Sequence, residues 1–126
     1  SLLPHETVIQ WVEVEKIGRT TMLQYFYEVL DKEDVLQLKK SVRTKLLEQL
    51  KEVRIFFDDL AQTHELYPDL LGSENLVIVR DHHRVDPHFI LLDIGLMDFK
   101  QPLPITKKAM QLSLKRTIET YRKLLS

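Results

Sequence analysis

The sequence predicts an α+β fold in which small strands and a hairpin pack on amphipathic helices. Three observations lead to this class. A long middle stretch has apolar residues at helical spacing, a strand–turn–strand pattern follows it, and a second stretch with helical spacing closes the chain. Helices and strands that occur in separate runs along a chain, rather than in strict alternation, are typical of the α+β class.

Composition indicates a globular protein of ordinary size. The 126 residues are 44% hydrophobic and 29% charged, and the net charge is -1. We therefore expect a single module over residues 1–126, without global attraction to nucleic acid or to an anionic membrane. The apolar runs are too short to span a bilayer. We expect a cytoplasmic location. Because the chain begins at Ser1 rather than at a methionine, we also expect it to be a piece of a longer protein.

The absence of cysteine limits the chemistry that is open to the chain. Without cysteine there is no disulfide, no thiolate nucleophile and no cysteine-based zinc site.

The first thirty residues contain one clear element and one ambiguous one. Val8 to Val14 is rich in β-branched and aromatic residues, which predicts a strand, and Gly18 interrupts the pattern. Thr20 to Leu30 fits both a helical stripe and the alternation of a strand. A helix is the preferred interpretation, because Thr20 and Thr21 are suitable caps.

A long amphipathic helix is expected from Val35 to about His64, with a possible break near Ser41. Its apolar residues recur at three- and four-residue steps and form a wide stripe, so that one face should be buried. The stripe consists of Leu36, Leu38, Val42, Leu46, Leu47, Leu50, Val53, Phe57 and Leu60. Pro68 is expected to end the helical region.

The second half of the chain predicts a hairpin and a final helix. Asp69 to Glu74 reads as a loop, Leu76 to Val79 as a strand, and His88 to Asp93 as its partner. Pro102 and Pro104 interrupt the chain again. Thr106 is expected to cap a last amphipathic helix that extends from Met110 to Leu125.

The two ends of this hairpin carry the candidate metal ligands. Asn75 precedes the first strand and Asp93 follows the second, so a hairpin places them at the same end. One carboxylate and one amide oxygen suit magnesium, which completes its coordination with water and phosphate. The alternative is that Asn75 caps a turn and Asp93 only ends a strand.

The order of these elements resembles the C-terminal lobe of protein-kinase-like folds. "YPDLLGSEN" stands where that family has H-R-D-L-x-x-x-N, and "LLDIG" stands where it has D-F-G. "QWVEVEKIG" would be the hinge and "TTMLQYFYEVL" the helix after it. The nearest similarity is to small bacterial kinase-like proteins of a PhoP-regulated type. The resemblance implies that Asn75 and Asp93 hold magnesium on ATP phosphates and that Asp69 is the catalytic base.

Departures from the family pattern weaken the catalytic part of this resemblance. Tyr67 and Pro68 replace the His-Arg pair, and Asp69 lies six residues before Asn75 where the family has five. The Gly-rich loop and the strand lysine are missing from the chain. We therefore expect a truncated or degenerate lobe with weak or no phosphotransfer, which binds magnesium–nucleotide or a protein partner.

Two other interpretations remain open. His82, His83 and His88 lie with Asp81 and Asp86 around the hairpin turn and suit zinc or nickel, although solvated turn residues explain them as well.

The other alternative is a non-catalytic module for protein interaction or homo-oligomerisation. In that case helical faces around Phe56, Phe57 and Tyr121 would bind the partner.

Overall fold

The computed structural model describes residues 10–12, 16–17, 20–21, 27–68, 76–81, 86–92, 96–98 and 104–126. It confirms the α+β class. The strands are β1 (Gln10–Val12), β2 (Lys16–Ile17), β3 (Thr20–Thr21), β4 (Tyr27–Leu30), β5 (Leu66–Pro68), β6 (Leu76–Asp81), β7 (His88–Leu92) and β8 (Leu96–Asp98). The helices are α2 (Lys32–Leu36), α3 (Lys40–Asp59), the π-helical turn η1 (Leu60–His64) and α4 (Pro104–Leu125).

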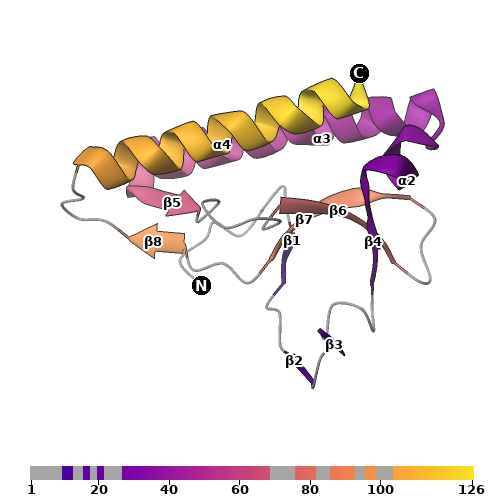
Figure 1. Cartoon of the computed structure of the whole chain (residues 1–126). Helices are drawn as coiled ribbons and strands as arrows, with labels where there is room; N and C mark the ends of the chain where they lie inside the picture. Colours follow the sequence, from indigo (N-terminus) through magenta and orange to yellow (C-terminus); the bar gives the residue numbers. More distant parts are fainter. Residues whose placement is uncertain are drawn as a thin grey trace.

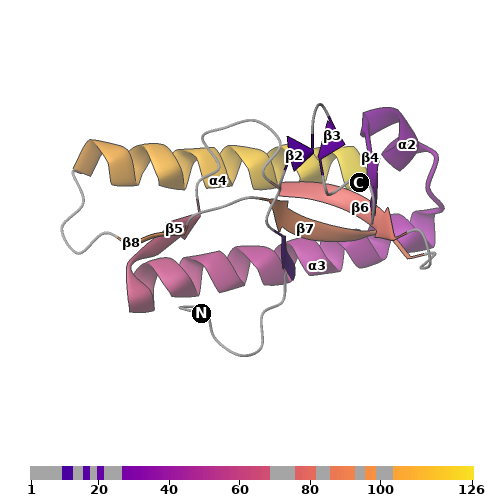
Figure 2. The ribbon, with the colours of Figure 1, turned by 90° about the horizontal axis from the view of Figure 1, so that it is seen from below.

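The two long helices form one layer and the main sheet forms the other. α3 and α4 run antiparallel, side by side, and the sheet lies beneath them (Figures 1 and 2). This sheet has four strands in the order β1-β7-β6-β4. β6 pairs antiparallel with both β7 and β4, whereas β1 pairs parallel with β7. Two small ladders, β2-β3 and β5-β8, complete the described strands.

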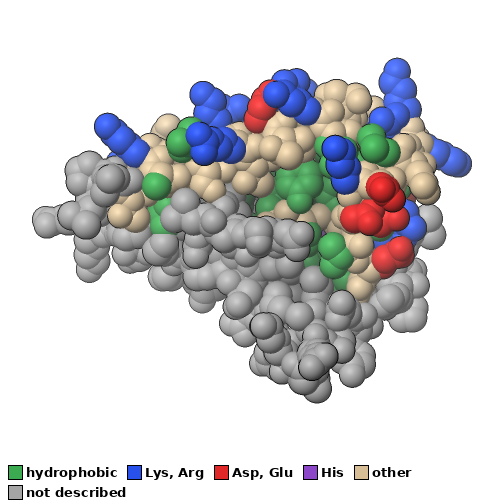
Figure 3. Space-filling view, viewed as in Figure 1, with side chains coloured by type: hydrophobic (Ala, Val, Ile, Leu, Met, Phe, Trp, Pro, Cys, Tyr) green, Lys and Arg blue, Asp and Glu red, His purple; other side chains and the backbone are tan. Residues whose placement is uncertain are grey.

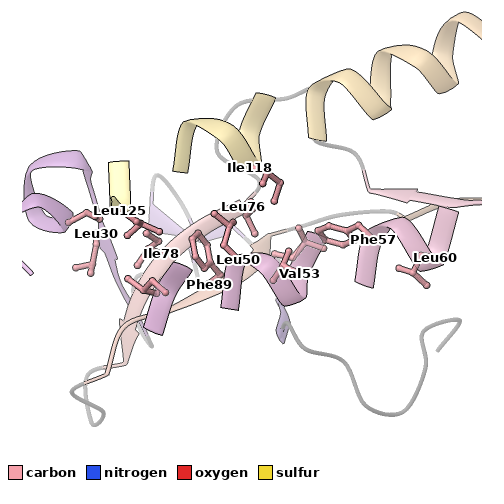
Figure 4. Close-up of a cluster of buried hydrophobic side chains, with 13 residues drawn as sticks. Leu30, Leu50, Val53, Phe57, Leu60, Leu76, Ile78, Phe89, Ile118 and Leu125 are labelled. Atoms are coloured by element: carbon pink, nitrogen blue, oxygen red, sulfur yellow. The ribbon is translucent and has the colours of Figure 1, made fainter. Parts of the chain in front are cut away.

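The core lies between the helical layer and the sheet (Figure 4). Its buried members come from β4, β6 and β7 and from all of the helices, and fix the sheet against the helix pair. They are Leu30, Val35, Leu46, Leu50, Val53, Phe57, Leu60, Leu76, Ile78, Phe89, Leu91, Ile118 and Leu125.

The hairpin strands are apolar on both faces. Leu76 and Ile78 belong to the helix-side core, while Val77 and Val79 pack with Ile90 in a second buried cluster. Successive strand residues point to opposite faces, so burial on both sides requires an uninterrupted apolar run. "LVIV" and "FILL" are such runs, which is why the sequence identified these strands.

The long helical stretch is confirmed, with its break slightly before the expected place. Gln37, Leu38 and Lys39 separate α2 from α3. α2 also begins earlier than expected, because Asp31 and Asp34 form a reciprocal capping box at its start.

The preference for a helix over residues 20–30 is wrong at both ends of the segment. Thr20–Thr21 and Tyr27–Leu30 are strands, and residues 22–26 lie outside the described part of the chain. Tyr27–Leu30 pairs antiparallel with β6, with Val29 opposite Val79. Pairing with a distant strand decided between two local patterns that were nearly equal.

Two further expectations about helix ends are corrected. Pro68 does not end the helical region, because Glu65 already ends it in a left-handed conformation (φ 53°) and Pro68 lies in β5. Thr106 is not a cap, because α4 begins at Pro104. Proline is favoured in the first helical turn, where its missing N–H leaves no hydrogen bond unmade.

We expect Phe57→Ala to lower the free energy of unfolding by about 3–5 kcal/mol, because this ring projects from α3 into the core and is fully buried there. The control is Ile55→Ala on the same helix, where the side chain is 68% exposed and the change should stay within about 0.5 kcal/mol. Urea unfolding measures both. Similar losses in the two variants would contradict the observed orientation of α3.

Candidate functional site

The candidate site is the end of the hairpin where β6 begins and β7 ends. Leu76 and Leu91 are register partners there. Asn75 directly precedes Leu76 in the chain, and Asp93 directly follows β7. Asn75, Asp93 and Asp69 themselves lie outside the described residues, so the structure defines the strands that carry them and not their side chains.

Two strand pairs frame the segments that contain these three candidates. Pro68 of β5 pairs with Leu96 of β8, and Leu76 of β6 pairs with Leu91 of β7. Residues 69–75 connect β5 to β6, and residues 93–95 connect β7 to β8. Both segments therefore connect the same small ladder to the same end of the hairpin.

Tyr121 attaches the start of β6 to α4. Its hydroxyl donates a hydrogen bond to the backbone carbonyl of Leu76, the residue after Asn75. Its ring also meets the ring of Phe89 edge to face, with the centroids 5.0 Å apart. An edge-to-face pair adds to the burial of both rings. One side chain of α4 thus holds the first residue of β6 by a polar contact and Phe89 of β7 by an apolar contact.

Gln49 attaches β7 to α3. The Phe89 N–H donates to Oε1 of Gln49 at 2.9 Å, and Nε2 of Gln49 donates to the Phe89 carbonyl at 3.4 Å. The amide thus binds both backbone groups of one strand residue, as a neighbouring strand would. Sequence reasoning missed this residue. The available signal was a glutamine three residues after Leu46 and four before Val53, within the apolar stripe.

Ionisable groups do not converge among the described residues. No group of three or more His, Asp or Glu side chains in that part of the chain is arranged to hold a metal ion. A hydrogen bond from Arg122 keeps the pKa of the Glu119 carboxyl below its ordinary value and raises the pKa of Arg122. This pair is exposed on α4, where water screens such interactions.

The histidine group is described in part. His88 begins β7, with Nδ1 3.4 Å from the Asp86 carbonyl and its ring 6.3 Å from that of Tyr27. His82 and His83 lie outside the described residues. The described contacts of His88 are those of a packed strand residue, and the zinc or nickel interpretation stays a prediction.

The structure also contains a groove that the sequence did not indicate. It has a volume of about 720 Å³ and lies between β4, α2 and the C-terminal end of α4. Figure 3 shows hydrophobic side chains exposed below the helix that carries the lysine and arginine side chains. Val29 and Leu36, which line the groove, are unusually exposed for apolar residues.

Comparison of the chain with protein-family models, with curated proteins and with solved structures found no match in any of the three. The kinase-like resemblance is therefore neither supported nor opposed by known relatives. Among the described residues, no helix combines the length and apolarity needed to cross a membrane.

We expect Gln49→Leu to lower the free energy of unfolding by about 1–3 kcal/mol, because two partly buried backbone groups of Phe89 lose their partner. Gln111→Leu is the matched control on α4, where the side chain is exposed and the change should be within about 0.5 kcal/mol. Urea unfolding gives both values. Hydrogen exchange should also be faster at the Phe89 amide of the Gln49 variant. An unchanged rate there would show that Gln49 does not hold β7.

Proposed function

We propose that this chain is a degenerate kinase-like lobe that binds a magnesium–nucleotide at the end of the β6–β7 hairpin, with weak or no phosphotransfer. One observation carries the proposal. Residues 69–75 and 93–95 connect the β5-β8 ladder to the β6–β7 hairpin along the chain, and these two segments contain all three candidate residues. The kinase-like resemblance rests on short motifs. The pairing of β5 with β8 and of β6 with β7, which those motifs do not specify, supports it.

The proposed ligand chemistry follows from residue types. Asp93 would supply a carboxylate oxygen and Asn75 an amide oxygen, and magnesium would take its remaining ligands from water and nucleotide phosphates. Tyr121 and Gln49 support this arrangement, because they hold the strands next to the two candidates against α4 and α3. A cytoplasmic location belongs to the same proposal, because ATP and magnesium are abundant there.

Weak phosphotransfer follows from the position of Asp69. It comes directly after β5, and its spacing to Asn75 is one residue longer than in the kinase pattern. A general base must lie within hydrogen-bond reach of the hydroxyl it activates. If the chain is a phosphotransferase, Asp69 is the candidate base. Its departure from the family spacing is the reason that we propose binding with weak or no transfer for the chain alone.

A thermal-shift titration with ATP and magnesium tests this proposal. At about one hundred times its dissociation constant, the ligand should add about 2.7 kcal/mol of stability. We expect the rise in Tm to require magnesium and to disappear in Asp93→Asn, because the amide removes the anionic ligand. Asp86→Asn, an exposed residue at the opposite end of the hairpin, should keep the full rise. The proposal fails if magnesium and ATP leave the Tm unchanged, or if Asp93→Asn responds like the unaltered chain.

The second candidate function is an interaction module that binds a protein partner or another copy of the chain. The exposure of Val29 and Leu36 beside the groove favours it, because apolar patches on a protein surface often mark interaction sites. The helical face around Phe57 is not that surface. Phe57 is buried in the core, and Phe56 and Tyr121 are partly buried against it.

A further inference from the structure

The groove has the size and lining of a binding site. About 720 Å³ falls within the range of roughly 300–1,000 Å³ that is usual for ligand pockets. Its apolar lining comes from three elements, β4, α2 and α4, with one residue from β6. These residues are Val29, Leu30, Val35, Leu36, Val77 and Leu124. Val29 and Leu36 are 42% and 53% exposed, so the groove offers uncovered apolar surface to an occupant.

The helix along one side of the groove is strongly basic. α4 contains six lysine and arginine residues and a single acid, Glu119, although the whole chain has a net charge of -1. The cations are Lys107, Lys108, Lys115, Arg116, Arg122 and Lys123. Lys123 lines the groove itself, and Lys32 lines it from α2. An occupant of this groove therefore meets Lys123 on the α4 side and Lys32 on the α2 side.

Asp31, the acid that lines the groove, is already engaged. Asp31 accepts a hydrogen bond from the Asp34 N–H at 2.8 Å, and Asp34 accepts one from the Asp31 N–H at 3.0 Å. Their charge is favourable where it is, at the start of α2. The charged residues of the groove lining are thus Lys123 on α4, Lys32 on α2 and the engaged Asp31.

We propose that the groove binds a short segment of a partner protein in which large apolar side chains are flanked by aspartate or glutamate. The apolar side chains lie against Val29 and Leu36, and the carboxylates face Lys123 and Lys32. Such a segment buries apolar surface while its charge meets the opposite charge, which fixes its register. This inference rests on the interaction module as second candidate function and is independent of the magnesium site.

Charge alone would also attract nucleic acid or an anionic membrane. The apolar lining favours a peptide, because a nucleic acid backbone has no aliphatic side chain to place in a concave groove, and a bilayer surface is broad rather than narrow. Both alternatives are included as outcomes below.

The test is selection of random peptides of about twelve residues, displayed on phage, against the full chain. We expect the selected peptides to combine large apolar residues with Asp or Glu. Their affinity should fall about tenfold or more for the double variant Val29→Thr, Leu36→Gln. Lys123→Gln should weaken binding and reduce its dependence on salt. The matched controls are Ile55→Asn and Lys45→Gln, exposed residues of α3 that do not line the groove.

The outcomes separate the groove from the broader interaction function. Peptides that bind the Val29/Leu36 double variant as well as the unaltered chain overturn the groove but leave an interaction module elsewhere. Enrichment of no peptide overturns both. Two results would overturn the acidic segment as the occupant. The first is that the selected peptides are basic. The second is that single-stranded DNA or phosphatidylserine vesicles compete with every selected peptide for binding. Circular dichroism of each variant checks that it is folded.

Discussion

The attachment of Phe89 to both long helices is the interaction on which the rest of this structure depends. Its ring is fully buried and meets Tyr121 of α4, while its backbone N–H and C=O are bound by Gln49 of α3. One residue of β7 is thereby fixed to two helices that are distant from each other in sequence. The position of the sheet on the helical layer is then defined, because β6 pairs with β7 and β4 pairs with β6.

Both proposed sites follow from this placement. The hydrogen bond from Tyr121 to the Leu76 carbonyl holds the end of the hairpin where the candidate magnesium ligands leave the strands. The β4 edge of the same sheet faces α2 and the last turns of α4, which creates the groove. Apolar burial supplies most of the stability of this layer, and the hydrogen bonds of Gln49 and Tyr121 set its position.

Much of the fold was predictable from the sequence, because α3 and α4 have apolar residues at helical spacing and the β6–β7 hairpin consists of two short apolar runs between turn residues. β4 could not be predicted, because Tyr27–Leu30 is so short that its residues fit a strand and a helix equally well until the pairing with β6 is known. The hydrogen bonds between Gln49 and the backbone of Phe89 could not be predicted either, because bonds between distant segments leave no local pattern in the sequence. The candidates Asn75 and Asp93 came from residue type and order alone, and they stay predictions.

Native-state hydrogen exchange measures most directly whether the hairpin and the helices form one cooperative unit. If Phe89 fixes the sheet to both helices, the slowest amides of β6 and β7 should exchange with the same free energy as those around Val53 on α3, through global unfolding. Exchange of the hairpin through a smaller opening, with α3 still protected, would contradict the account, because the hairpin would then be a separable unit that the helices do not hold in place.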